Sequence, residues 1–178
     1  MLIAAWLLLA LLVFWGLGAY HRLTRLRAGI GSAWQQLEPA LRTLASAGQQ
    51  LAERGRGWLP AEGSALDGLM QTSADLLVAV QAVAARPHAA EPVVQLAVAH
   101  ALHAAALQRV RSLLALVEHD EPDAERRTLL VSLQGAEQQR DFARQLFNQR
   151  VQGFNAAQAA WPTRALTGLF GFHDAGML

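Results

Sequence analysis

Two histidines, His100 and His103, lie three residues apart, so on a helix both imidazole rings could face one metal ion. A zinc-type site needs at least one more ligand, and Glu118 lies too far along the same helix to complete it. His88 and His119 could contribute only through the tertiary fold, and the chain has no His-Glu-x-x-His motif. A metal- or ligand-binding site is therefore an alternative, and we expect the pair to lie on a partly exposed stripe.

The sequence offers no motif for covalent catalysis. There is no cysteine, which excludes a thiol nucleophile, a disulfide framework and a thiolate zinc site. The few serines and threonines fall in no Gly-x-Ser-x-Gly, Ser-x-x-Lys or phosphate-loop pattern. All basic residues are arginines, and the formal net charge of +1 gives no overall basic field of the kind that nucleic-acid binding needs. We predict that the protein is not an enzyme and has no cofactor, no catalytic or metal-binding residue and no nucleic-acid partner.

A second group of ionisable residues, Glu137, Arg140 and Arg144, lies along the stretch predicted to form the last helix. Their spacing allows Glu137 and Arg140 to meet on neighbouring turns. A buried ion pair would help to fix the register of the helix, whereas an exposed pair would contribute little to stability. The exposed pair is the preferred interpretation.

The same stretch carries a repeat of aromatic and amide residues with a period of seven. Phe147, Phe154 and Trp161 fall on one stripe, and Asn148 and Asn155 follow the first two of them directly. An aromatic stripe with this spacing is most simply a packed helix face. The amides beside it could hydrogen-bond a neighbouring helix or cap a polar contact.

The first twenty residues contain no charged side chain, and twenty helical residues span roughly 30 Å, about the thickness of the hydrocarbon core of a bilayer. Aromatic residues of the kind that collect at membrane interfaces occur at Trp6, Trp15 and Tyr20, and three arginines follow directly. The sequence therefore predicts one transmembrane helix over residues 1–20, with the arginine end in the cytoplasm. A cleaved signal peptide is the alternative, but it would need a basic N-terminal region and a shorter apolar run.

Beyond this segment, apolar residues recur at alternating spacings of three and four, which is typical of helices that bury one face. The first such seam consists of Leu23, Leu26, Ile30, Ala33, Leu37, Ala40, Leu44, Ala47 and Leu51. Pro39 lies inside it and predicts a kink or a helix boundary. Further helices are predicted over about 66–85, about 91–118, and from the acidic break at 120–123 to about residue 160. No stretch alternates with a period of two, so we predict an all-α fold, an antiparallel bundle of long helices over residues 21–162 behind the membrane anchor.

Residues 163–178 form a separate apolar segment rich in glycine. This segment could present a hydrophobic patch to a partner, but an exposed aromatic tail promotes aggregation. We therefore expect it to dock on the bundle.

The C-terminal part of the chain resembles the LemA family of bacterial membrane-anchored proteins. That family carries a Glu-x6-Arg-x2-Tyr-Asn-x2-Val-x2-Tyr-Asn pattern, a Phe-Pro soon afterwards and a Gly-Phe near the end. Phe or Trp replaces the usual Tyr or Phe here, and the matching residues are Glu137, Arg144, Phe147, Asn148, Val151, Phe154, Asn155, Trp161, Pro162, Gly171 and Phe172. Two further matches are Trp34 in an Ala-Trp pair after the anchor, and Glu118 followed by Pro122 in the acidic break.

This resemblance covers nearly the whole chain, although residues 41–46 depart from the family pattern and His21 replaces the usual Asn. It implies a divergent LemA-like protein with one N-terminal membrane helix, a long helical bundle and no established enzymatic activity.

The function that we expect is that of a membrane-anchored interaction or scaffold protein in a bacterial inner membrane, with its bundle in the cytoplasm. The expected partners are the lipid bilayer, through residues 1–20, and another protein or a second copy of the chain. The alternatives are a bundle that binds or remodels membranes and, less favoured, a histidine-dependent metal- or ligand-binding protein.

Overall fold

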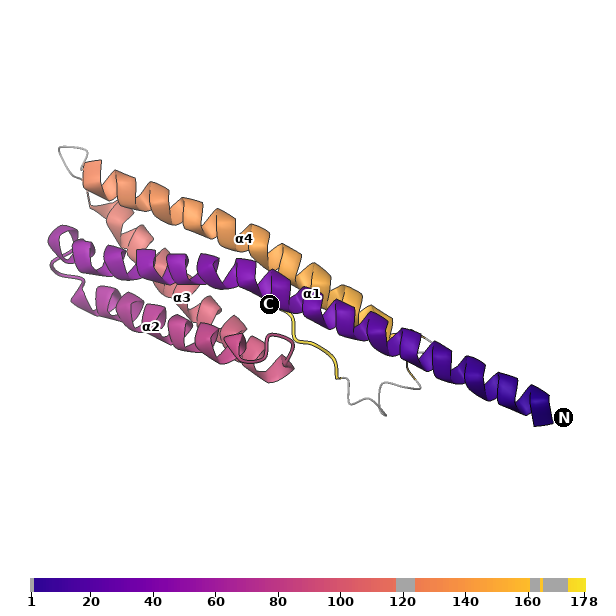
Figure 1. Cartoon of the computed structure of the whole chain (residues 1–178). Coiled ribbons are helices and arrows are strands. Elements are labelled where there is room, and N and C mark those ends of the chain that lie inside the picture. Colours follow the sequence, from indigo (N-terminus) through magenta and orange to yellow (C-terminus); the bar gives the residue numbers. More distant parts are fainter. Residues whose placement is uncertain (1, 118–123, 161–163, 165–172) are drawn as a thin grey trace.

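The protein folds into four α-helices, and the residues that the computed structural model describes, 2–117, 124–160, 164 and 173–178, contain no β-strand. The helices are α1 (Leu2–Trp58), α2 (Gly63–Ala84), α3 (Ala90–Leu116) and α4 (Ala124–Ala159). Figure 1 shows an elongated bundle from which the N-terminal part of α1 projects. The predicted all-α helical bundle is confirmed.

Helix α1 runs without interruption through the predicted membrane segment and the apolar seam. The boundary that Pro39 predicts does not occur. Proline lacks the N–H that would bond the carbonyl of Gln35, but both residues lie on the exposed side of the helix, where water can satisfy that carbonyl. Leu37 and Ala40 on either side of Pro39 are fully buried, and their packing holds the helix through this position.

The apolar seam of α1 lies along the centre of the bundle. All of its residues are buried except Leu26, which is partly buried and packs against the core. Helix α1 packs against both α4 and α2, and α2 packs in turn against α3 (Figure 1). Helices α3 and α4 therefore each pack mainly against one other helix. They are connected to each other by side-chain hydrogen bonds and an ion pair.

The core divides along the bundle into two apolar clusters. The proximal cluster, nearer the projecting end of α1, contains the aromatic residues Trp34, Phe147 and Phe154. The distal cluster has only leucine, valine and alanine among its buried residues, such as Leu51 and Leu69. Between the two clusters the helices carry polar residues, which we call the polar layer. Its members are Ser73, His100, His103 and Arg140.

The helix limits follow the sequence signals with small shifts. The predicted ranges 66–85 and 91–118 compare with Gly63–Ala84 and Ala90–Leu116 in the structure. Pro92 lies in the first turn of α3, where no intrahelical N–H is needed.

Helix α3 is, within the described residues, the one found long and apolar enough to cross a membrane, by length and composition alone. One face of α3 is buried in the bundle, whereas Val94, Val98 and Leu102 on another face are each 56% exposed. The predicted span over residues 1–20 is not shown by this criterion and stays a prediction.

The projecting part of α1 exposes a series of large apolar side chains. Those at least half exposed are Ile3, Trp6, Leu7, Leu9, Leu11, Leu12, Val13, Phe14 and Leu17. Leu23, by contrast, is 1% exposed and joins the proximal cluster. The environment of α1 thus changes within about one helical turn after Tyr20.

Candidate functional site

The C-terminal segment, residues 173–178, lies between α3 and α4, and two asparagines of α4 hold its main chain. Asn155 accepts a hydrogen bond from the Ala175 N–H at 2.9 Å and donates one to the Ala175 carbonyl at 3.0 Å. Asn148 makes the same pair of bonds with Leu178, accepting from its N–H at 2.9 Å and donating to its carbonyl. Each asparagine therefore binds one residue of the segment through both of its main-chain groups.

The spacing of these bonds explains the period of the asparagines. Seven helical residues, from Asn148 to Asn155, advance about 10.5 Å. Three residues of extended chain, from Ala175 to Leu178, advance about 10 Å. The two amides are thus in register with two residues of the segment that stand three apart, and their hydrogen bonds are made to its main chain. The sequence left a neighbouring helix or a capped polar contact open for these amides, and the partner in the structure is the main chain of the C-terminal segment.

Two further contacts fix the segment. Gln158 on α4 donates a hydrogen bond to the His173 carbonyl at 3.0 Å. On the opposite side Gly176 lies so close to α3 that an added Cβ would stand 2.9 Å from both the Ala90 Cα and the Val93 Cβ. Only glycine fits this approach without movement, so the segment is held between both helices. The docking that we expected for residues 163–178 is present for residues 173–178.

The aromatic residues of the repeat point the other way, into the core. Phe147 and Phe154 are at most 1% exposed, and Val151 between them is fully buried. The Phe147 ring meets the Trp34 ring edge to face, with centroids 6.1 Å apart and planes at 68°. The repeat therefore does two things on adjacent stripes of α4: the aromatic residues pack in the proximal cluster, and the amides bind the C-terminal segment.

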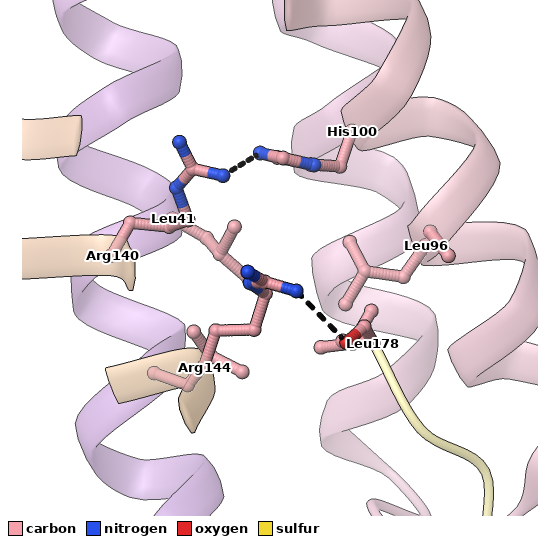
Figure 2. Close-up of a pocket in the computed structure, with 8 residues that line it drawn as sticks. Leu41, Leu96, His100, Arg140, Arg144 and Leu178 are labelled. Carbon is pink, nitrogen blue, oxygen red and sulfur yellow. Dashed lines mark hydrogen bonds between the residues drawn. The ribbon is translucent and has the colours of Figure 1, made fainter. Parts of the chain in front are cut away.

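A cavity of about 290 Å³ lies beside the end of this segment. Its walls combine apolar side chains with three nitrogen-bearing ones, and the lining residues are Leu37, Leu41, Leu96, Ala97, His100, Arg140, Arg144 and Leu178. Figure 2 shows Arg140 and Arg144 reaching from α4 toward α3 and the C-terminal segment. Arg144 donates a hydrogen bond to the Leu178 carbonyl at 3.3 Å.

Arg140 and His100 link α4 to α3 across the same cavity. The Arg140 Nη1 lies 2.6 Å from the His100 Nε2 (Figure 2). A guanidinium can only donate, so this imidazole nitrogen accepts and carries no proton. Burial, followed by the positive charge of Arg140, lowers the pKa of His100 to about 4, which agrees with a neutral ring. Asp141 lies 3.4 Å from Arg140 and 3.9 Å from Arg144, so one carboxylate serves two guanidiniums.

His103 turns away from His100 and is completely buried. Its Nδ1 lies 3.3 Å from the Ser73 Oγ, whose hydroxyl donates to the Leu69 carbonyl at 2.7 Å. The Ser73 proton is thus used, so the His103 Nδ1–H is the donor to Ser73. Burial and then the charge of Arg140 lower the pKa of His103 to about 4.

The partly exposed stripe that we expected for the two histidines is wrong for His103. The cause lies on α1, where a Cβ at Gly48 would stand 2.6 Å from the His103 Cε1. The missing side chain leaves room for the imidazole ring. The two histidines have different partners, and the described residues contain no group of three histidine, aspartate or glutamate side chains that could hold a metal ion.

Glu137 pairs across helices rather than along its own. Both of its carboxylate oxygens accept from Arg111 of α3, at 3.0 and 2.8 Å. The predicted partners Arg140 and Arg144 pair instead with Asp141. The preference for an exposed pair within one helix was therefore wrong, because both members of the Arg111–Glu137 pair are only about a quarter exposed.

The model of the LemA family matches residues 33–178, which is most of the chain. The chain belongs to the LemA family. No curated protein and no solved structure matches it. In this LemA protein, the aromatic motif residues that the structure describes, Trp34, Phe147 and Phe154, lie together in the proximal cluster, whereas the motif residue Glu137 pairs with Arg111 farther along α4.

Several LemA motif residues lie outside the described part of the chain. They are Glu118, Pro122, Trp161, Pro162, Gly171 and Phe172. The sequence did not mark Arg111, Gln158 or Gly176 as parts of the site. None of these three stands in a periodic pattern, and each acts on a segment distant in sequence.

Proposed function

We propose that this LemA protein is a single-pass protein of a bacterial inner membrane whose cytoplasmic helical bundle binds another protein or a second copy of itself. The observation that carries this proposal is the continuity of α1, which passes as one helix from an exposed apolar segment into the core of the bundle. Because the helix is unbroken, the orientation of residues 2–20 in the membrane would determine the orientation of the bundle.

The anchor is supported by length, exposure and flanking charge. Residues 2–20 have no charged side chain, and their large apolar side chains are exposed, a state that is costly in water and favourable in lipid. Arg22, Arg25 and Arg27 follow the apolar run, which favours a cytoplasmic location for this end.

The binding surface that we assign is the outward face of α3. Val94, Val98 and Leu102 lie four residues apart, so they form one row along the helix, and each is more than half exposed. The opposite face of the same helix is occupied by the bundle core, through residues such as Val93 and His103. An amphipathic partner helix with a matching apolar row fits this surface.

Membrane attachment and sidedness can be tested on the full-length protein. Because the chain has no cysteine, a single Gln149→Cys on exposed α4 surface gives one labelling site. We expect the protein to resist alkaline extraction from membranes and the cysteine to be labelled only from the cytoplasmic side. Extraction into the soluble fraction, or labelling from outside, would contradict the anchor or its orientation.

The α3 surface can be tested by crosslinking in native membranes. A Val98→Asp variant should lose its crosslinks to a partner or to a second copy, because a charge in the apolar row opposes docking. A Gln95→Asp variant adds the same charge to an exposed position of α3 and serves as the matched control. Equal crosslinking by both variants would remove this face from the proposal.

A second candidate is a bundle that binds or remodels membranes, and the apolar character of α3 favours it. In that case the chain without residues 1–20 should bind protein-free vesicles through α3, and its Val98→Asp variant should lose this binding. Under the interaction proposal, the chain without residues 1–20 binds protein and does not bind added vesicles.

A further inference from the structure

A second cavity, of about 450 Å³, opens at the end of the bundle from which residues 2–20 project. It brings together parts of the chain that are distant in sequence. Arg27 comes from α1, Arg86 and His88 come from the α2–α3 connection, and His173 and Asp174 come from the C-terminal segment.

Neither arginine of this cavity is paired with a carboxylate within the described part of the protein. Arg27 contacts the Nε2 of His88 through its guanidinium, and neither Arg27 nor Arg86 makes an ion pair with a described carboxylate. Glu91 and Asp174 also line the cavity, but neither stands within ion-pair distance of these arginines. Two guanidiniums with free donors therefore share one opening.

His88 holds one of these guanidiniums in position. Its Nε2 accepts from Arg27, so the ring carries its proton on Nδ1 and is neutral. Burial, Arg27 and Arg86, in that order, lower the pKa of His88 below 6.5. The neutral His88 imidazole holds the Arg27 guanidinium in place and does not change the charge of either arginine.

The cavity lies close to the headgroup layer of the proposed bilayer. Arg27 follows Tyr20 by seven residues, a rise of about 10 Å along α1. The headgroup layer occupies roughly 5–7 Å on each side of a bilayer core that is roughly 30 Å thick. With residues 2–20 in the bilayer, the Arg27 Cα stands about 3–5 Å beyond this layer, so the cavity that Arg27 lines opens next to the headgroups.

We propose that this cavity binds the phosphate of an anionic phospholipid headgroup, with Arg27 and Arg86 donating to its oxygens. Guanidinium donors suit phosphate oxygens, and Ala89 and Pro92 provide an apolar wall for the glycerol carbons. This inference rests on the proposed membrane anchor. A soluble phosphate offers the same oxygens, so the experiment must separate lipid from free phosphate.

The test uses full-length protein in maltoside micelles that contain equal amounts of phosphatidylglycerol and phosphatidylcholine, with retained lipids counted by native mass spectrometry. We expect the wild type to retain phosphatidylglycerol preferentially. An Arg27→Gln, Arg86→Gln variant should lose this retention by about tenfold or more, because two charge-assisted contacts are removed. Both arginines are exposed, so the substitutions leave the core intact.

The matched control is an Arg22→Gln, Arg25→Gln variant, which removes the same charge from the same end of the molecule but outside the cavity. It should retain phosphatidylglycerol as the wild type does. Equal loss in both variants would show that only net charge matters, and absence of preference in the wild type would also overturn the proposal. Displacement of the lipid by millimolar inorganic phosphate would reassign the cavity to a soluble phosphate ligand.

Failure of this proposal is distinguishable from failure of the anchor. Lipid counting in micelles reads the cavity directly, whereas alkaline extraction of native membranes reads residues 2–20. A protein that stays in membranes yet shows no lipid preference keeps the anchor and loses the cavity assignment.

Discussion

The proximal and distal halves of the bundle share the same helices but are closed on the α3–α4 side by different means. In the distal half, the ion pair between Arg111 and Glu137 and a hydrogen bond from Arg126 to the Leu114 carbonyl join the two helices. In the proximal half, the C-terminal segment occupies this side and is bonded through Asn148 and Asn155. Most of the family-motif residues that the structure describes lie in the half that needs a separate chain segment to complete it.

The two ends also differ in how their arginines are used. At the distal end, Arg54 pairs with Glu125 and Arg56 pairs with Asp67. At the proximal end, Arg27 and Arg86 have no such partner among the described carboxylates. Arg54 and Arg56 are thus paired with carboxylates at the distal end, whereas the two cavity arginines, at the end that points toward the proposed bilayer, are not.

We expect the largest effect from a substitution in the proximal cluster, whose core contains aromatic residues, unlike that of the distal cluster. Phe147→Ala should lower the free energy of unfolding by about 3–5 kcal/mol, because it removes a fully buried ring that contacts Trp34. Denaturant unfolding measures this value, and the exposed Phe142→Ala provides the control, with an effect near zero. A loss below about 1 kcal/mol would show that the proximal half can repack around the cavity.

Acid should act on the polar layer between the halves. The folded-state pKa of His100 and of His103 is about 4, below the ordinary 6.5, so between these values the unfolded chain binds protons that the folded chain does not. The contribution of the two histidines to the free energy of unfolding is therefore fully present above pH 6.5. It falls as the pH drops toward 4, by up to about 1.4 kcal/mol per histidine for each pH unit.

Denaturant unfolding at several pH values between 7 and about 4.5 measures this slope. A His100→Gln variant should show a shallower pH dependence, since one of the two groups no longer titrates. An unchanged slope would show that His100 does not cause the acid sensitivity.

Release of the C-terminal segment should weaken the proximal half alone. Asn148→Ala with Asn155→Ala removes four hydrogen bonds and should lower stability by about 1–3 kcal/mol while the four helices remain. Hydrogen exchange should then increase at residues 173–178 and leave the distal half unchanged. The exposed Gln149→Ala is the control, and protection that persists in the double variant would show that Gly176 packing alone holds the segment.

The smallest effect belongs to the distal surface pairs. Arg56→Gln should change stability by only about 0.5 kcal/mol or less, because both Arg56 and Asp67 side chains are about two-thirds exposed. Thermal unfolding in low and high salt measures this difference. A loss above about 1 kcal/mol would mean that the distal end depends on its ion pairs more than their exposure indicates.

The sequence predicted best what is periodic and local. The seam from Leu23 to Leu51 follows from spacing alone, and the structure buries it. The role of Asn148 and Asn155 could not be predicted, because their partner is an extended segment without periodicity that lies 20 and 30 residues further along the chain. The burial of His103 depends on the absence of a side chain at Gly48, a fact about a different helix.

Pro39 carries a strong local sequence signal that nevertheless did not predict the structure, because no helix boundary occurs there. Its local signal is strong, but the signal concerns one hydrogen bond, and the consequence depends on which side of the helix that bond lies. Exposure of Pro39 and Gln35 decides the outcome, and exposure is set by packing of the whole bundle.

Because α1 is one unbroken helix, a tilt of its N-terminal part would tilt the whole bundle. From Tyr20 to Trp58 the helix rises about 57 Å, and helices in bilayers tilt by about 20° on average. With residues 2–20 in the membrane, a tilt of this size moves the distal end sideways by about 20 Å. A change in bilayer thickness that alters the tilt would therefore be amplified into a large displacement of the far end of the bundle, where α1 turns into α2.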